Sequence, residues 1–247
     1  MFSFFKKANH SNASLFPENF VDIHSHLIPG IDDGAKTFEE ALKLIQKLGE
    51  MGIVNFVTTP HIMEGLYPNS RTTITQKHNE LLLYLQKHNC NNVSIKVAAE
   101  YMLDANFLTL LEKKDLLTIG TNHILVEMSY FNMPINLYDI LFKIQLAGYK
   151  PILAHPERYA FLHSNYSTYH KLKNAGCKFQ LNLLSLTDYY GKKTKSMALK
   201  LLQDKLIDFV GSDTHNMQHV RFLNELNTKK NKKLLATVFE KNSKFLK

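Results

Sequence analysis

Short β-branched runs alternate with helical stretches along most of this chain, and nearly every run ends at a histidine or a carboxylate. The first run begins at Val21 and carries His24 and His26, so in an extended segment both imidazoles leave the same face. Later runs end in the same way, at His61, Glu100, Glu127, His155, and the pair Asp213 and His215. A single His-x-His pair is weak evidence for a metal site, and two surface histidines are its ordinary alternative. Repetition at the ends of successive runs favours the metal site.

The same alternation predicts an α/β fold in which helices wrap a parallel sheet. Apolar residues repeat at helical spacing between the runs, as between Thr37 and Gly52, where Thr37 and Glu40 have the spacing of a capping box. The expected strands cover residues 21–25, 53–58, 94–98, 123–127, 151–154, 178–181 and 208–210. Seven such units favour closure into a barrel, and a barrel gathers functional residues at the C-terminal ends of its strands.

The length of 247 residues suits a single domain, which we expect at residues 20–247 after an N-terminal extension at 1–19. Cys90 and Cys177 form no closely spaced pair, so we expect reduced thiols and a cytoplasmic protein. No apolar run approaches the ~20 residues that span a bilayer. Residues 1–7 hold three phenylalanines beside two lysines, and we expect a frayed terminus there, with peripheral membrane contact as the alternative.

The formal net charge of +8 raises the question of nucleic-acid binding. Many lysines fall on expected helix exteriors or in the run at residues 229–233, where a solvated surface is the usual explanation. We therefore expect no nucleic-acid partner.

Nine candidate ligands would meet at one rim of such a barrel: His24, His26, Asp33, His61, Glu100, Glu127, His155, Asp213 and His215. Such a set fits two or three divalent ions with a bridging carboxylate. Mixed nitrogen and oxygen donors without thiolate favour manganese, iron or zinc over calcium or magnesium. Without metal, four carboxylates at close range would oppose folding, and the alternative is a set of separately satisfied polar residues. Clustered ions supply hydroxide near neutral pH and neutralise charge on phosphate, which predicts phosphoester hydrolysis.

Two arginines follow candidate ligands. Arg158 lies three residues past His155, where its planar fork would hold two phosphate oxygens, with a surface salt bridge as the alternative. Arg221 lies six residues past His215 and is a candidate second phosphate clamp, or equally a helix-surface arginine.

The motifs around these residues resemble the polymerase and histidinol phosphatase (PHP) superfamily. They are Asp22-Ile23-His24-Ser25-His26 with Pro29-Gly30-Ile31-Asp32-Asp33-Gly34, Thr59-Pro60-His61, Ala99-Glu100-Tyr101, Ala154-His155-Pro156-Glu157-Arg158-Tyr159 and Gly211-Ser212-Asp213-Thr214-His215-Asn216. Within it, the chain is similar to the bacterial manganese-dependent tyrosine-protein phosphatases of capsule and exopolysaccharide loci. The resemblance covers about residues 20–220.

The resemblance implies a distorted seven-stranded (β/α)7 barrel of the PHP type with three metals. By its pattern, one ion is held by His24, His26 and Asp213, a second by Glu127 and His155, and a third by Asp33, His61 and His215, and Glu100 bridges the first two. Arg158 would bind the phosphate while metal-activated hydroxide attacks phosphorus in line. The family usually has its second arginine one place earlier than Arg221.

The implied substrate is the tyrosine-rich C-terminal tail of a membrane-bound bacterial tyrosine kinase that controls polysaccharide export, and the oligomeric state is left open. Neither cysteine lies in the Cys-x5-Arg cradle of phosphatases that form a phosphocysteine. Two alternatives remain: another PHP phosphoesterase, acting on histidinol phosphate or nucleic acid, and a metal-stabilised scaffold without catalysis.

Aromatic residues and further histidines complete the set. Tyr130-Phe131 and Tyr189-Tyr190 follow strands at the expected rim, where they would stack on a phosphotyrosine ring or simply pack. The remaining histidines are expected at the surface, and they are His10, His78, His88, His123, His163, His170 and His219.

Overall fold

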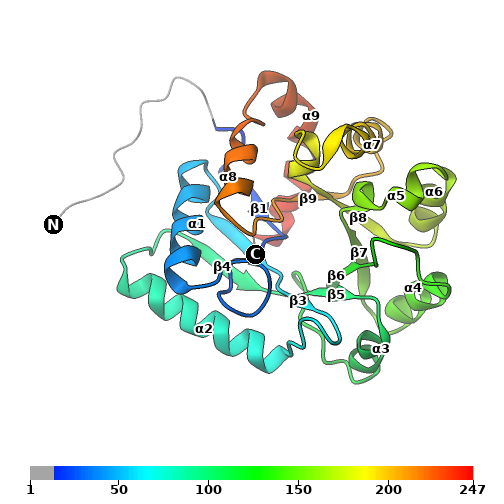
Figure 1. Cartoon of the computed structure of the whole chain (residues 1–247), viewed down its shortest axis with the longest axis horizontal. Coiled ribbons are helices and arrows are strands. Elements are labelled where there is room, and N and C mark those ends of the chain that lie inside the picture. The colour runs from blue at the N-terminus through cyan, green and yellow to red at the C-terminus, as the bar shows by residue number, and fades with distance from the viewer. Residues whose placement is uncertain (1–13, 247) are drawn as a thin grey trace.

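A computed structural model of the chain describes residues 14–246, in which nine strands form two parallel sheets (Figure 1). The smaller sheet has the order β1-β2-β4, with β1 Val21–Asp22, β2 Asn55–Thr58 and β4 Ser94–Val97. The larger has the order β3-β5-β6-β7-β8-β9, with β3 His61–Ile62, β5 Glu100–Met102, β6 His123–Glu127, β7 Lys150–Ala154, β8 Lys178–Asn182 and β9 Phe209–Gly211. The predicted α/β fold with a parallel sheet is confirmed. The sheet is curled, and the predicted count of seven strands is not reproduced.

Two additional short strands explain the difference in count. Thr58 pairs with Val97 and His61 with Glu100, so the register is the same on both sides of the gap between β2 and β3. Pro60 has no N–H and cannot donate into the ladder, although its carbonyl still accepts from Glu100 N at 3.1 Å. The strand pair is therefore interrupted at Pro60. As a result, His61 and Glu100 lie three residues past the ends of β2 and β4 and begin short strands of the larger sheet.

Helices surround the curled strands on the outside (Figure 1). They are α1 Phe38–Glu50, α2 Arg71–Lys87, α3 Ala105–Glu112, α4 Leu137–Leu146, α5 Ala160–His163, α6 Ser167–Asn174, α7 Gly191–Gln203, α8 Met217–Asn224 and α9 Lys229–Asn242. Thr37 caps α1 as predicted, because its side chain accepts from Glu40 N. The Glu40 carboxylate accepts from Lys36 N, one residue before the cap, so the expected capping box is only half formed. Helix α5 was not predicted, since four residues show no helical period.

The segments that follow β1 and β9, the first and last strands of the chain, contact each other. Ser25 and Thr214 form a parallel bridge, and Asp213 N donates to the His24 carbonyl at 2.7 Å. The Asp22 carboxylate accepts from both the backbone N–H and the hydroxyl of Ser212. These contacts place the residues that follow β1 directly beside those that follow β9.

The core continues to the start of the described chain. Phe16 is buried, and its ring centroid lies 5.0 Å from that of Phe20 and 5.4 Å from that of Phe239 on α9. Residues 1–13 of the expected extension, with their phenylalanine and lysine segment, lie outside the described residues. Both cysteines are free and buried. No described helix combines the length and apolar character needed to cross a bilayer.

Candidate metal centre

All nine predicted ligands lie together at the C-terminal side of the sheet. His24, His26 and Asp33 follow β1, His61 begins β3, Glu100 begins β5, Glu127 ends β6, His155 follows β7, and Asp213 and His215 follow β9. Their ligand atoms form four overlapping groups, each within 4.8 Å: His26, Asp33, His61 and His215; His24, His26 and Asp213; His24, Glu100 and His155; and His61, Glu100 and Glu127. The strands bring together residues that are up to 191 positions apart in the chain.

Glu100 is at the centre of this cluster. Its Oε1 lies 3.0 Å from His155 Nε2, and its Oε2 lies 3.0 Å from His24 Nε2 and 3.3 Å from His61 Nδ1. The carboxylate is buried, so it has no access to bulk water. One carboxylate therefore faces three imidazoles with two oxygens, which is the arrangement a bridging ligand requires.

A pair of atoms deeper in the cluster has no hydrogen-bond partner. His61 Nδ1 and Glu127 Oε1 lie 2.7 Å apart, yet neither makes a hydrogen bond of acceptable geometry, and both are buried. His155 Nδ1 is likewise buried without a partner. Buried polar atoms are normally satisfied, so His61 Nδ1 and Glu127 Oε1, which lie side by side without a hydrogen bond, are atoms that a cation would engage. The residues present thus fit a metal ion.

Two residues that the sequence analysis did not assign orient the first histidine pair. His24 Nδ1 donates to Gln180 Oε1 at 2.7 Å, and His26 Nδ1 donates to Asp32 Oδ2 at 2.8 Å. These bonds place a proton on Nδ1, so each Nε2 is the nitrogen that faces the other ligands and that would coordinate a cation. Asp32 also accepts from His61 N at 3.2 Å and from Gly34 N at 2.9 Å, so it ties the loop after β1 to β3.

The backbone at the ends of β7 and β9 is strained. His155 has φ 35° and Asp213 has φ 50°, in the left-handed region that costs a residue with a side chain about 1 kcal/mol or more. Gly211 permits the close approach of β9 to the cluster, because a Cβ there would lie 2.5 Å from His24 Cβ. Both features turn ligand side chains toward one centre.

Charge pairing shifts the ionisation of the cluster. Burial opposes protonation of His24, but Glu100 and Asp213 outweigh it and raise the pKa of His24 to about 9. Burial likewise opposes ionisation of Glu100 and Asp213, and neighbouring histidines hold both pKa values well below the usual range. Burial, with Arg158 nearby, lowers the pKa of His155 to about 4. Glu100 and Asp213 are therefore ionised and ready to coordinate a cation, whereas burial and the nearby Glu100 raise the pKa of Glu127.

Arg158 lies at the edge of the cluster, where the sequence predicted a phosphate contact. Its Nη1 donates to Asp213 Oδ2 at 3.0 Å, and its side chain is 20% exposed. The preceding residue, Glu157, is buried, and its Oε1 accepts from Asn182 N at 3.0 Å and from the Ser185 hydroxyl at 2.6 Å. Glu157 thereby anchors the short 3-10 turn Pro156–Arg158 that carries the arginine.

Arg221 does not join the site. It is exposed on α8, and within residues 14–246 it makes no ion pair or hydrogen bond with the cluster. The buried face of α8 holds His219, Val220 and Leu223 instead. His219 was expected at the surface, which is wrong: its Nδ1 lies 3.0 Å from the Asp213 carbonyl and its Nε2 lies 2.9 Å from the Tyr189 hydroxyl. The helix phase directs His219 inward and Arg221 outward.

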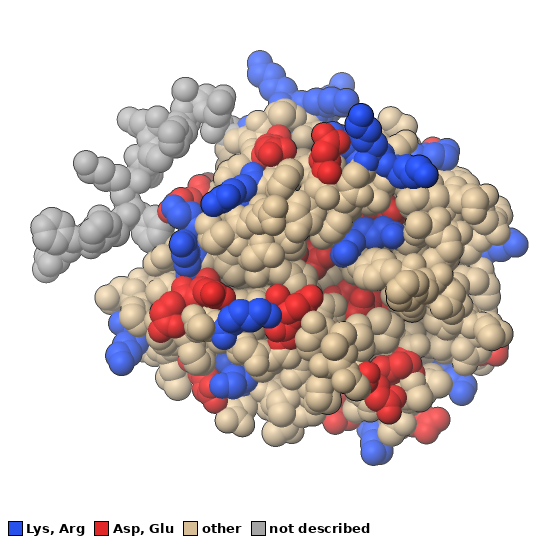
Figure 2. Space-filling model, viewed as in Figure 1, with Lys and Arg blue, Asp and Glu red and all other residues tan. Residues whose placement is uncertain are grey.

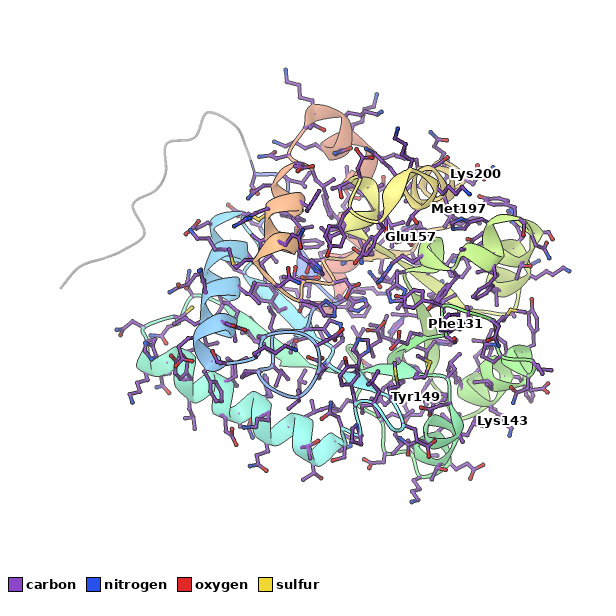
Figure 3. The ribbon with its side chains drawn as sticks, in the orientation of Figure 1. Phe131, Lys143, Tyr149, Glu157, Met197 and Lys200 are labelled. Atoms are coloured by element: carbon purple, nitrogen blue, oxygen red, sulfur yellow. The ribbon has the colours of Figure 1, made fainter. Side chains whose placement is uncertain are left out.

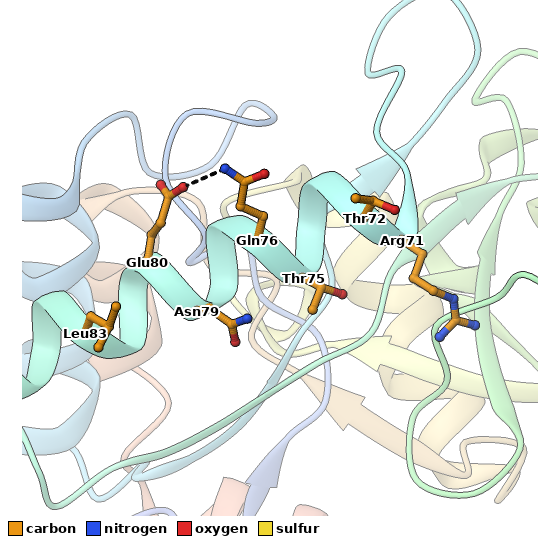
Figure 4. Close-up of a pocket in the computed structure, with 7 residues that line it drawn as sticks. All are labelled: Arg71, Thr72, Thr75, Gln76, Asn79, Glu80 and Leu83. Carbon is orange, nitrogen blue, oxygen red and sulfur yellow. Dashed lines mark hydrogen bonds between the residues drawn. The ribbon is translucent and has the colours of Figure 1, made fainter.

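The surface views agree with this placement. In Figure 2, acidic side chains line the floor of a central hollow, and Lys and Arg residues lie around it. A shallower hollow runs along the outer side of α2, lined by residues from Arg71 to Leu83 (Figure 4). Its lining includes Gln76 bonded to Glu80 but no histidine. Among residues 14–246, the groups of side chains that could hold a metal ion are those of the nine-residue cluster.

Comparison with known proteins gives consistent matches. Residues 20–246 match the family described as capsular polysaccharide synthesis, CpsB/CapC. The chain is 31% identical over 208 residues to tyrosine-protein phosphatase YwqE of Bacillus subtilis, covering 82% of this chain and 80% of that protein. It is 31% identical over 205 residues to tyrosine-protein phosphatase CpsB of Streptococcus pneumoniae, covering 80% of this chain and 83% of that protein.

Solved structures give the same result. The fold matches a structure reported among those of YwqE from Bacillus subtilis and CpsB from Streptococcus pneumoniae, which are described as unique metal-dependent tyrosine phosphatases. The TM-score is 0.81 and the identity 28%, over 92% of this chain and 93% of the other. Histidinol phosphate phosphatase from Lactococcus lactis matches with a TM-score of 0.54 and 14% identity, over 87% of this chain and 94% of that chain. That second likeness concerns the fold alone.

Proposed function

The chain belongs to the CpsB/CapC family of capsular polysaccharide synthesis, and on that premise we propose that it is a metal-dependent protein-tyrosine phosphatase. This membership confirms the resemblance predicted from the motifs. The observation that carries the proposal is the cluster of nine ligand residues beside Arg158. In the relatives named above, tyrosine phosphatase activity and metal dependence are part of the description.

Two of the three proposed ligand sets correspond to groups in the cluster, and the third, Glu127 with His155, comes from the resemblance to the family. One ion would be held by His24, His26 and Asp213, and another by Asp33, His61 and His215. A further ion would be held by Glu127 and His155. Glu100 supports this arrangement because its two oxygens face different imidazoles. In the structure Glu127 is grouped with His61 and Glu100, with 2.7 Å between Glu127 Oε1 and His61 Nδ1. We propose manganese as the metal, with iron and zinc as the alternatives.

The residues around the cluster have separable tasks. Bound ions of this kind lower the pKa of water so that hydroxide is available near neutral pH. Arg158 would hold the phosphate through N–H groups that its bond to Asp213 leaves free. Asp32 and Gln180 would orient His26 and His24. Each residue thus binds or orients, and none needs to form a covalent intermediate.

The cysteines support a route without phosphocysteine. Burial raises the pKa of the Cys177 thiol to about 12, so the thiol is protonated at neutral pH. Burial also raises the pKa of Cys90. Since the thiolate is the nucleophilic form, neither side chain is prepared for attack on phosphorus.

The substrate is proposed to be a phosphotyrosine-bearing bacterial tyrosine kinase, at its tyrosine-rich C-terminal tail. The family description supports a role in capsule synthesis, and the relatives support phosphotyrosine as the reacting group. We place the protein in the cytoplasm, where such a tail would meet it and where both thiols would stay reduced.

The finer fold proposal is a single domain at residues 20–247, with Leu15 and Phe16 of the preceding segment packed into its core, that forms a distorted seven-stranded barrel of the PHP type. The unchanged register across the gap at Pro60 supports it, since β2 with β3 and β4 with β5 would count as one strand each. The bridge between Ser25 and Thr214 supports closure.

Substrate comparison tests the function. Manganese-loaded protein is offered a phosphotyrosine peptide, histidinol phosphate and single-stranded nucleic acid in parallel. Preferential turnover of the peptide supports the proposal. Preferential turnover of either other substrate would assign a different phosphoesterase activity, and metal-replete protein that cleaves none of them would be a scaffold.

A further inference from the structure

The guanidinium of Arg158 lies between the rings of two tyrosines. Its Cζ is 4.8 Å from the ring centroid of Tyr130 and 4.2 Å from that of Tyr190. Both distances are within the range at which the negative face of an aromatic ring attracts a cation. We propose that Tyr130 and Tyr190 are positioning residues that hold Arg158 ready for the phosphate of the substrate. This inference rests on the proposed function, in which Arg158 binds that phosphate.

The two tyrosines belong to different loops. Tyr130 follows β6, and Tyr190 immediately precedes α7, which begins at Gly191. Arg158 lies on a third segment, the turn after β7. In Figure 3 the neighbouring labels Phe131 and Glu157 mark the first and third of these segments. The contacts of Arg158 with both rings therefore form only when these three segments of the rim are folded together.

Each ring is fixed by contacts other than Arg158. The ring of Tyr130 stacks on His155, with centroids 5.7 Å apart and an angle of 23°. The Tyr190 hydroxyl accepts from Asn182 Nδ2 at 3.3 Å, and its ring meets Tyr189 edge-on at 4.8 Å. Asn182 also donates to Asp213 Oδ2 at 2.6 Å. The rings are thus held by residues that border the metal cluster, which sets where the guanidinium can lie.

The contacts with the two tyrosine rings leave Arg158 free to bind an anion. Among the described residues, Asp213 is the only hydrogen-bond partner of the guanidinium, so most of its N–H donors are unused. A long arginine side chain otherwise loses conformational freedom when it binds a ligand. The two rings beside Cζ restrict the motion of the side chain without using its N–H donors. Restriction before binding should therefore strengthen phosphate binding.

The contacts with Arg158 help to distinguish the two roles that the sequence suggested for Tyr130 and Tyr190. Stacking on a substrate ring and simple packing were the two alternatives for Tyr130 and Tyr190. Each ring already lies against the guanidinium, which favours a contact with Arg158 over a contact with the substrate ring.

Phosphate titration tests the inference. The full chain loaded with manganese is titrated with inorganic phosphate by calorimetry, for the native protein and for Tyr190→Leu, Tyr190→Phe, Tyr130→Leu and Tyr130→Phe. Each leucine variant should weaken phosphate binding about fivefold, because a cation–ring contact of this size is lost. Each phenylalanine variant should stay within about twofold, because its ring face is retained. Tyr138→Leu on α4 is the matched control, since Tyr138 is 40% exposed, and it should bind phosphate as the native protein does.

The same substitutions in an Arg158→Ala background separate positioning from general damage. If the tyrosines act through Arg158, Tyr190→Leu has no further effect once the guanidinium is absent. If phosphate binding weakens in Arg158→Ala but in neither leucine variant, the positioning role of the tyrosines is wrong, while the proposed role of Arg158 stands. An equal loss with phenylalanine, or an undiminished loss in the Arg158→Ala background, would also overturn that positioning role. A native protein that binds no phosphate would overturn the proposed function and this inference with it.

Discussion

Arg158 Nη1 lies 3.0 Å from Asp213 Oδ2, so the candidate phosphate-binding arginine and a candidate metal ligand form one ion pair. The other oxygen of Asp213, Oδ1, lies 3.3 Å from His24 Nε2 and 3.4 Å from His26 Nε2. Asp213 is 2% exposed, so these contacts are shielded from water. One carboxylate thus sets the distance between the arginine and the histidine cluster.

Arg158→Ala should abolish most phosphatase activity without removing metal. Loss of one preorganised donor to a developing anion commonly costs about 10²–10³-fold in rate, and we expect kcat/KM on a phosphotyrosine peptide to fall by about that factor. Metal content should stay at the native value because Arg158 is not a ligand. The check is steady-state kinetics with metal analysis of the same preparation. Native turnover in this variant would contradict the role of Arg158.

Asp32→Asn should weaken metal binding although Asp32 is outside the predicted ligand set. The charged acceptor that holds His26 Nδ1–H at 2.8 Å is replaced by a neutral one. Loss of such a partner typically costs about 10–100-fold in metal affinity. Manganese titration against a competing chelator measures the effect. Asp139→Asn, an exposed substitution on α4, is the control and should bind manganese as the native protein does.

Gly211→Ala should destabilise the fold, whereas Gly49→Ala should not. A Cβ at Gly211 would lie 2.5 Å from His24 Cβ and 2.8 Å from Gln180 Nε2, and overpacking of this kind costs about 1–3 kcal/mol. Gly49 lies within α1 with no atom within 4 Å of its would-be Cβ, so alanine there should add about 0.5–1 kcal/mol of helix stability. Denaturant unfolding measures both. Equal stabilities for the two variants would contradict the close approach of β9 to His24.

His123 should make stability depend on pH below neutrality. Burial, with Lys244, Lys150 and Lys178 nearby, lowers its pKa from 6.5 to about 4. The unfolded chain therefore takes up a proton first, so stability falls as the pH drops from about 6.5 toward about 4. His123→Gln should remove this contribution. The measurement is the free energy of unfolding at pH 7 and pH 5 for both proteins, where the native protein should lose more than the variant. Equal losses would contradict the burial effect.

The grouping of the nine candidate ligands could be predicted from sequence because it depends on the order of strands along the chain. In a parallel α/β fold, residues at successive strand ends meet at one rim, so chain position alone predicts that His24, His155 and Asp213 are neighbours. The elements were predictable for the same reason: β6 was expected at 123–127 and lies there.

The orienting residues could not be found in this way. Gln180 lies 156 positions from His24, inside β8, and only the folded sheet brings its side chain to the imidazole. Asp32 belongs to the motif at residues 29–34, in which only its neighbour Asp33 was the expected ligand. The geometry of the turn decides which of the two carboxylates faces which histidine.

The buried face of α8 and the strand break at Pro60 could both have been predicted from the sequence. His219, Val220 and Leu223 share the helical spacing of a buried face, which leaves Arg221 on the outer side of α8. Pro60 lies between the expected strand at residues 53–58 and His61, and a proline there indicates a ladder break, which is where β2 ends and β3 begins.

The most direct test of the central claim is hydrolysis of a phosphotyrosine peptide by protein stripped of metal with a chelator, with and without added manganese. We expect no turnover by the stripped protein and recovery when manganese is restored, because the cluster of nine candidate ligands would then hold the ions that supply hydroxide. Full turnover by protein that analysis shows to be free of metal would contradict the central claim.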